Sequence, residues 1–363
     1  MPFRTIAAAV LGTLIPVFDC AAGVPLIELK TSNGAYRGRV VAKDDETALL
    51  IDRDGVARGV PLRDVTEFVV AEKDFKPLSA VDLRDRLRRL VGGDADVTAT
   101  PHYVVAGRSS AARAVAEALE EVHNGYRWFC STRRLKLSDP EFPLVAIVMP
   151  NRATFDAYCT AEGMSPNPSL QGYYRETTNR FVCYESGGSR SDSLAGVRDT
   201  LVHEAIHQLA FNTGLHVRMG DSPTWVVEGL ATTLEPESVR RPLRSDVKPL
   251  DRTNPERLET YLAAVDRKRQ VRAFDLVSSD QPFRSSALDA YATAWAMSFY
   301  LLETRPADYA KYLRTLSARS PLAEATADER NRDFRAAFGD IDPQQLDAEM
   351  TRFLRRVAAG AQR

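Results

Sequence analysis

Two histidines and a glutamate with helical spacing are the residues of this chain best suited to chemistry. His203, Glu204 and His207 form the pattern His-Glu-x-x-His, and the 363 residues include only five histidines. Residues four apart share one face of a helix, so both imidazoles can approach one metal ion while Glu204 reaches a water beside it. The pattern predicts a metal site that activates water for hydrolysis. The alternative is a pair of core histidines bonded to the backbone.

A third ligand is expected from the next apolar segment. Residues 221–235 predict a second helix, capped by Asp221 or Ser222 with Pro223 in its first turn. The residues between the two helices are rich in turn formers, so the second helix can fold back on the first. Glu228 is the predicted ligand, because two His and one Glu with a position left for water are the ligands of a catalytic zinc site. The alternative is an ordinary surface carboxylate.

The segments H-E-A-I-H-Q and W-V-V-E-G-L-A resemble the gluzincin zinc metallopeptidases, most closely the peptidase-MA-like domains of uncharacterised exported bacterial proteins. The metzincin pattern is absent, because Ala210 and Thr213 stand where it needs Gly and His. The resemblance covers residues 97–315. It implies a zincin-like α+β fold, one zinc ion per chain on the two motif histidines and Glu228, and Glu204 as the base that activates water.

One position departs from the resembled pattern. Many gluzincins carry Asp three residues after the ligand glutamate, where it orients the first histidine, and this chain has Ala231 there. The orienting group is therefore expected to be Asp199, Glu235 or a backbone carbonyl.

Two further residues are candidates for stabilising the oxyanion. The Y-x-x-A-W pattern at Tyr291, in a helix predicted from Ser286 to Leu302, resembles the helix that closes the cleft in related peptidases. The resemblance implies that Tyr291 stabilises the tetrahedral intermediate, and the alternative is a core aromatic stripe. His216, between the first two helices, is interpreted as a surface-loop residue, with donation to the oxyanion as the alternative.

The first 22 residues predict an export signal. Arg4 precedes an apolar run that Pro16 interrupts and that is too short to span a membrane. We expect a periplasmic or extracellular protein with no integral membrane span, and lipoprotein anchoring through Cys20 is the alternative. Removal of the signal leaves Cys130, Cys159 and Cys183, which allow at most one internal disulfide of undetermined pairing.

The remaining chain divides into three parts. Residues 24–72 predict five short strands in a small all-β SH3-like barrel without a catalytic cluster, interpreted as a structural or binding module with an envelope partner. Residues 73–96 predict a charged helical connector. Residues 97–363 predict an α+β metallopeptidase domain with strands near 102–106 and 144–149 and a hairpin within 171–184, helical from residue 196 onward.

The composition limits the classes of function. A formal charge of −1 gives no support to nucleic-acid binding, and 44% apolar residues are ample for a sizeable core. The sequence therefore predicts zinc-dependent hydrolysis of a peptide bond in an extracytoplasmic peptide or protein. The alternative is a zinc-stabilised envelope scaffold that binds a partner without hydrolysis.

Overall fold

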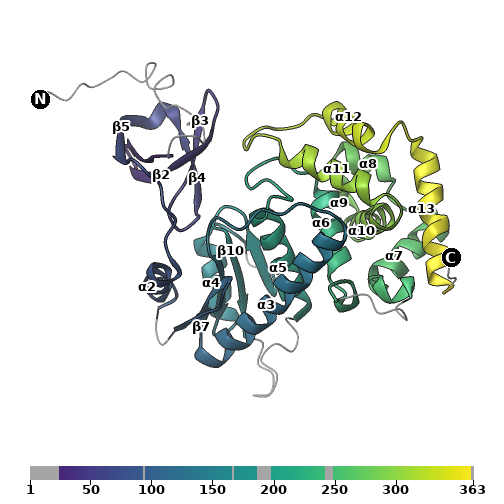
Figure 1. Ribbon diagram of the computed structural model, residues 1–363, viewed down its shortest axis with the longest axis horizontal. Helices are drawn as coiled ribbons and strands as arrows, with labels where there is room; N and C mark the ends of the chain where they lie inside the picture. The colour runs from purple at the N-terminus through teal and green to yellow at the C-terminus, as the bar shows by residue number, and fades with distance from the viewer. Residues whose placement is uncertain (1–23, 93–94, 166, 186–197, 242–247, 361–363) are drawn as a thin grey trace, which may run out of the picture.

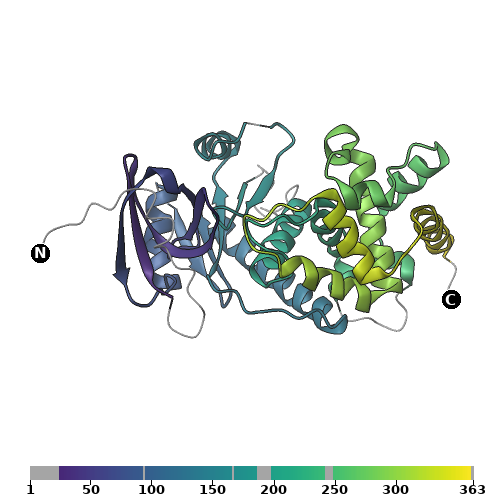
Figure 2. The ribbon, with the colours of Figure 1, turned by 90° about the horizontal axis from the view of Figure 1, so that it is seen from above.

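Three parts follow one another along the molecule in the computed structural model, which describes residues 24–92, 95–165, 167–185, 198–241 and 248–360. Figures 1 and 2 show an antiparallel sheet at one end, a mixed sheet with helices in the middle, and a helical part at the other end. The predicted export signal and Cys20 lie outside the described residues. In the described part of the chain, no helix is long and apolar enough to cross a membrane.

The N-terminal part is a five-stranded antiparallel sheet in the order β4-β3-β2-β1-β5. Ile27, Leu29 and Leu50 belong to one buried cluster of its apolar side chains, whereas Leu49 and Ile51 belong to another, because successive side chains of a strand point to opposite faces. The five predicted strands are confirmed, but the predicted barrel is not closed: β4 and β5 are the two ends of the sheet and do not pair within the described residues. The strands are β1 (Leu26–Thr31), β2 (Gly34–Lys43), β3 (Thr47–Ile51), β4 (Ala57–Pro61) and β5 (Val65–Glu72), with a 3-10 turn η1 (Leu62–Asp64) before β5.

A mixed sheet in the order β6-β7-β8-β10-β9 forms the centre of the molecule. Strands β7, β8 and β10 run parallel, while β6 and β9 are antiparallel edge strands. The strands predicted near residues 102–106 and 144–149 are confirmed as β7 and β8, and β10 lies within the predicted hairpin segment. The sequence analysis did not predict β6. The strands are β6 (Asp96–Ala99), β7 (Tyr103–Gly107), β8 (Leu144–Met149), β9 (Gly172–Arg175) and β10 (Arg180–Tyr184).

Helices cover both faces of this sheet, which explains why β8 is apolar at every position. Leu144, Ala146 and Val148 pack toward one pair of helices, and Val145 and Ile147 toward the other pair. The first pair is α3 (Ser109–Thr132) and α5 (Arg198–Asn212), and the second is α2 (Ala80–Val91) and α4 (Arg152–Ala161). The cysteines at 130, 159 and 183 are all free and buried in these layers.

The C-terminal part is built around one buried helix, α10. Helices α6 and α7 pack against α10, and α11 and α12 pack against each other beside α6 (Figure 1). The helices are α6 (Thr224–Leu234), α7 (Pro255–Asp266), α8 (Ala273–Ser278), α9 (Pro282–Ser285), α10 (Ala287–Thr304), α11 (Pro306–Ser317), α12 (Ala327–Phe338) and α13 (Pro343–Ala358), with 3-10 turns η2 (Glu237–Val239) and η3 (Pro249–Arg252).

Candidate metal centre

Three ligand atoms from α5 and α6 converge on one point. His203 Nε2 lies 2.9 Å from His207 Nε2, and Glu228 Oε2 lies 3.3 Å from the first nitrogen and 3.6 Å from the second. A tetrahedral ion with bonds of about 2.0–2.1 Å separates its ligand atoms by about 3.3 Å. The buried Glu228 Oε2 has no hydrogen-bond donor of suitable geometry within the described residues. These atoms therefore form a group that fits a small metal ion.

The charges around this point favour a cation. Burial opposes the ionisation of Glu228, but His207 and His203 outweigh it and hold the pKa of Glu228 well below its usual range. Burial also opposes the charging of His203, yet the neighbouring carboxylates of Glu228 and Glu235 raise the pKa of His203 well above its usual value. The carboxylates thus stabilise a positive charge at this place, which a bound proton or a metal ion can supply.

Glu235 is the residue that orients the first histidine. Its Oε1 lies 2.7 Å from His203 Nδ1, and its Oε2 accepts a hydrogen bond of 2.5 Å from Asn254 Nδ2. Of the groups expected for this role, Glu235 makes the contact because it follows Glu228 by two helical turns and shares its face. A carboxylate on Nδ1 fixes the ring so that Nε2 faces the ligand point.

Replacing Glu235 with Gln is expected to weaken Zn²⁺ binding about 10–100-fold, because the neutral amide no longer supports the imidazole electrostatically. The measurement is competition with a chelator of known zinc affinity. Glu237→Gln is the matched control, since Glu237 is an exposed neighbour whose carboxylate pairs with Arg241. Equal zinc affinity in the Glu235 variant and the control would contradict this role.

The packing of α6 against α10 determines where Glu228 lies. A Cβ at Gly229 would lie 2.3 Å from Ser298 Oγ and 2.4 Å from the Ala294 carbonyl oxygen, so only glycine permits this approach of the two helices. The predicted capping of α6 by Asp221 or Ser222 is wrong. The N-cap residue is Pro223, and Asp280 Oδ1, from far along the chain, accepts the Thr224 N–H at 2.9 Å.

Glu204 lies against the edge strand β9. Its Oε2 accepts a hydrogen bond of 2.7 Å from the backbone N–H of Tyr174, a group that points away from the paired strand β10. Burial raises the pKa of Glu204, and the neighbouring histidines act in the opposite direction. Glu204 is thus held beside the ligand point and next to a sheet edge that pairs with no second strand among the described residues.

Tyr291 on α10 borders the same space. A hollow of about 630 Å³, called here the His203 hollow, opens over the ligand point. Burial raises the pKa of Tyr291 to about 12, with further increases from Glu228 and Glu204, so its hydroxyl is a neutral donor. The hollow is lined by Asp199, Thr200, His203, Glu204, Glu235, Pro236, Asn254, Pro255, Glu256, Arg257 and Tyr291.

The interpretation of His216 as a surface residue is wrong, because it is only 2% exposed. Its ring packs against Phe211, with centroids 5.2 Å apart, because the N–H groups of Leu215 and His216 donate to the Ala210 carbonyl and turn the chain back toward the end of α5. Burial lowers the pKa of His216 to about 3, so the imidazole is neutral.

A second group of possible ligands lies on α3 and at the start of β7. His102, Glu120 and His123 approach one another there. The two imidazole rings are stacked, with centroids 3.7 Å apart and an interplanar angle of 25°. The in-plane lone pairs of stacked rings run side by side and do not converge on one ion, so this group does not fit a metal as arranged.

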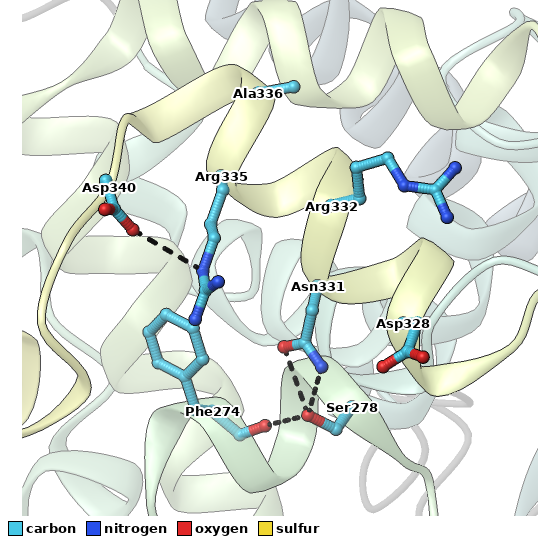
Figure 3. A pocket seen from close by; sticks show the side chains of 8 residues that line it. All are labelled: Phe274, Ser278, Asp328, Asn331, Arg332, Arg335, Ala336 and Asp340. Carbon is cyan, nitrogen blue, oxygen red and sulfur yellow. Dashed lines mark hydrogen bonds and ion pairs between the residues drawn. The ribbon is translucent and has the colours of Figure 1, made fainter.

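A separate hollow lies between α8 and α12, away from the motif helix (Figure 3). Two pairs of its polar side chains contact each other: Asn331 bonds to Ser278, and Arg335 lies 3.8 Å from Asp340. The described residues that line it contain no group of the metal-ligand type, and we assign no chemistry to it.

Sequence reasoning did not find Asn254, Arg257 and the Tyr174 amide as neighbours of the ligand point. Asn254 followed by Pro255 is a helix-start signal, and the Asn254 side chain does accept the Arg257 N–H at 3.1 Å. That signal predicts the helix but not its position, so nothing in the sequence placed these residues beside Glu235.

A family model described as "Protein of unknown function (DUF1570)" matches residues 198–323, about a third of the chain. The matched segment begins with α5 and includes α6 and α10, which carry the ligand group and Tyr291. A search of curated proteins found no match.

Proposed function

We propose that the protein is a zinc-dependent peptide hydrolase of gluzincin type. The observation that carries the proposal is the convergence of His203 Nε2, His207 Nε2 and Glu228 Oε2 at separations of 2.9–3.6 Å, with Glu204 on the same helix. Two imidazoles and one carboxylate leave a fourth position open, which is typical of catalytic rather than structural zinc. When bound, zinc supplies a Lewis acid and lowers the pKa of water toward about 7.

The side chains around this point support one division of roles. Glu204 takes a proton from the attacking water and delivers it to the leaving nitrogen, which its raised pKa assists. Tyr291 donates a hydrogen bond to the oxyanion that develops on the substrate carbonyl. Glu235 keeps His203 in one tautomer and orientation.

The arrangement of the sheet supports a peptide as the substrate. β9 is an edge strand, and in the described residues it pairs only with β10. An extended peptide can add to such an edge by main-chain hydrogen bonds, which places it alongside α5. We infer a zincin-like domain from this edge strand beside the motif helix.

The N-terminal sheet is proposed as an SH3-like binding module for an envelope partner, in a protein exported to the periplasm or beyond. Its five short antiparallel strands support the module, and the residues described here carry no group of metal-ligand type within it.

Metal content is the first test of the proposal. Elemental analysis of the purified protein is expected to give about one zinc per chain, and His207→Ala is expected to reduce this to near zero because two protein ligands hold zinc poorly. His102→Ala is the matched control, since His102 is a half-exposed histidine that pairs with Glu120. Absence of zinc after incubation with the metal and dialysis would overturn the proposal. A peptide-library digest of the zinc-loaded protein then tests hydrolysis itself.

A further inference from the structure

One guanidinium lies among the carboxylates of the His203 hollow. Arg257 is the only arginine or lysine among the described residues that line it, beside Asp199, Glu204, Glu235 and Glu256. It comes from the first turn of α7, whereas His203 and Glu204 come from the motif helix α5. A single cation placed beside a catalytic group is suited to hold one negative charge of a ligand.

Arg257 has little to bind within the protein itself. Its Nε is buried and has no hydrogen-bond partner in the described part of the chain. Its ion pair is with the neighbouring Glu256, at 3.8 Å, and the Glu256 side chain is 78% exposed. The guanidinium therefore has hydrogen-bond donors that the described residues leave unused, and a carboxylate in the hollow can accept from them.

The position of Arg257 is tied to the metal ligands. The Arg257 N–H donates to Asn254 Oδ1, Asn254 Nδ2 donates to Glu235, and Glu235 contacts His203. The guanidinium carbon also lies 5.7 Å from the centroid of the Tyr291 ring, which holds the side chain over that ring. These contacts keep Arg257 at a constant place relative to both His203 and Tyr291.

We propose that Arg257 forms a carboxylate-binding subsite that selects peptides with a carboxylate close to the cleaved bond. This inference rests on the proposed function and names its substrate class. The planar fork of arginine matches a carboxylate with two parallel hydrogen bonds. The surrounding acidic side chains repel a doubly charged group more strongly than a singly charged one, which favours a carboxylate over a phosphate. The carboxylate belongs either to the peptide C-terminus or to an Asp or Glu side chain.

The test measures binding, so it does not depend on hydrolysis. The zinc-loaded Glu204→Gln protein is titrated calorimetrically with three sets of dansylated pentapeptides: a free acid, its C-terminal amide, and amides with Glu at each position in turn. The free acid or one of the Glu peptides is expected to bind about 10–100-fold more tightly than the plain amide. The set that does so identifies the source of the carboxylate.

Adding Arg257→Gln is expected to bring the ratio of the two affinities, carboxylate peptide over plain amide, close to one. The matched control is Arg267→Gln, which is expected to leave this ratio unchanged because Arg267 is exposed at the end of the same helix. Arg257→Lys, which keeps the charge but not the fork, is expected to retain part of the ratio and guards against misfolding of the Gln variant. The subsite is overturned if the Glu204→Gln protein binds the free acid, the Glu peptides and the plain amide equally. It is also overturned if the preference for a carboxylate peptide persists in the Arg257→Gln variant. Carboxylate-selective binding by a protein that cleaves no peptide would instead overturn the hydrolase proposal and leave the subsite standing.

Discussion

Glu204→Gln is expected to lower kcat/KM for a cleaved peptide by about 10²–10⁴-fold, the range that a positioned general base contributes. The variant is expected to keep its fold and its zinc content, because Gln has the same shape as Glu. Its amide oxygen can still accept the hydrogen bond from the Tyr174 N–H, which Glu204 accepts at 2.7 Å. The measurements are steady-state kinetics, zinc content and circular dichroism on the same preparation.

Glu259→Gln is the control for the loss of one negative charge, since Glu259 is exposed on α7 and does not line the His203 hollow. Retained hydrolysis in the Glu204 variant would contradict the role of Glu204 as the general base. A wild-type protein that holds zinc, cleaves no peptide and unfolds when His203 is replaced by Ala would favour the zinc-stabilised scaffold over the enzyme.

Trp225→Ala is expected to destabilise the helical part by about 3–5 kcal/mol, the cost of removing a fully buried large aromatic side chain. Trp225 is 0% exposed and lies at the start of α6, with its ring stacked 5.6 Å from that of Tyr312. Phe334 packs against it edge-on from α12. The helices α11 and α12 therefore hold α6 in place, and Glu228 with it.

The measurement is urea unfolding followed by circular dichroism, with Val227→Ala as the control because Val227 lies on the same helix but is only half-buried. The variant is also expected to bind zinc more weakly, since displacement of α6 moves Glu228 from the two histidines. An unchanged unfolding midpoint in Trp225→Ala would show that α6 does not depend on this packing.

Several features of the fold follow from local patterns alone. Short runs separated by turn signals predicted the strands of the N-terminal sheet. The fully apolar run Leu144–Met149 predicted a buried strand. These patterns do not determine closure, because pairing of β4 with β5 would depend on the curvature of the whole sheet. The antiparallel strand β6 was missed because four residues give too short a pattern to recognise.

The candidate site divides in the same way. The sequence by itself determined that His203, Glu204 and His207 share a helix, and that Glu228 follows on another, because helical spacing is a local property. Only the tertiary structure decided that Glu235 rather than Asp199 contacts His203 and that Arg257 faces the hollow. Those contacts join residues far apart in the chain, so they depend on how helices pack, at positions such as Gly229 against Ser298. No local periodicity encodes such packing, and for that reason the candidate ligands could be predicted from the sequence while the residues that contact them could not.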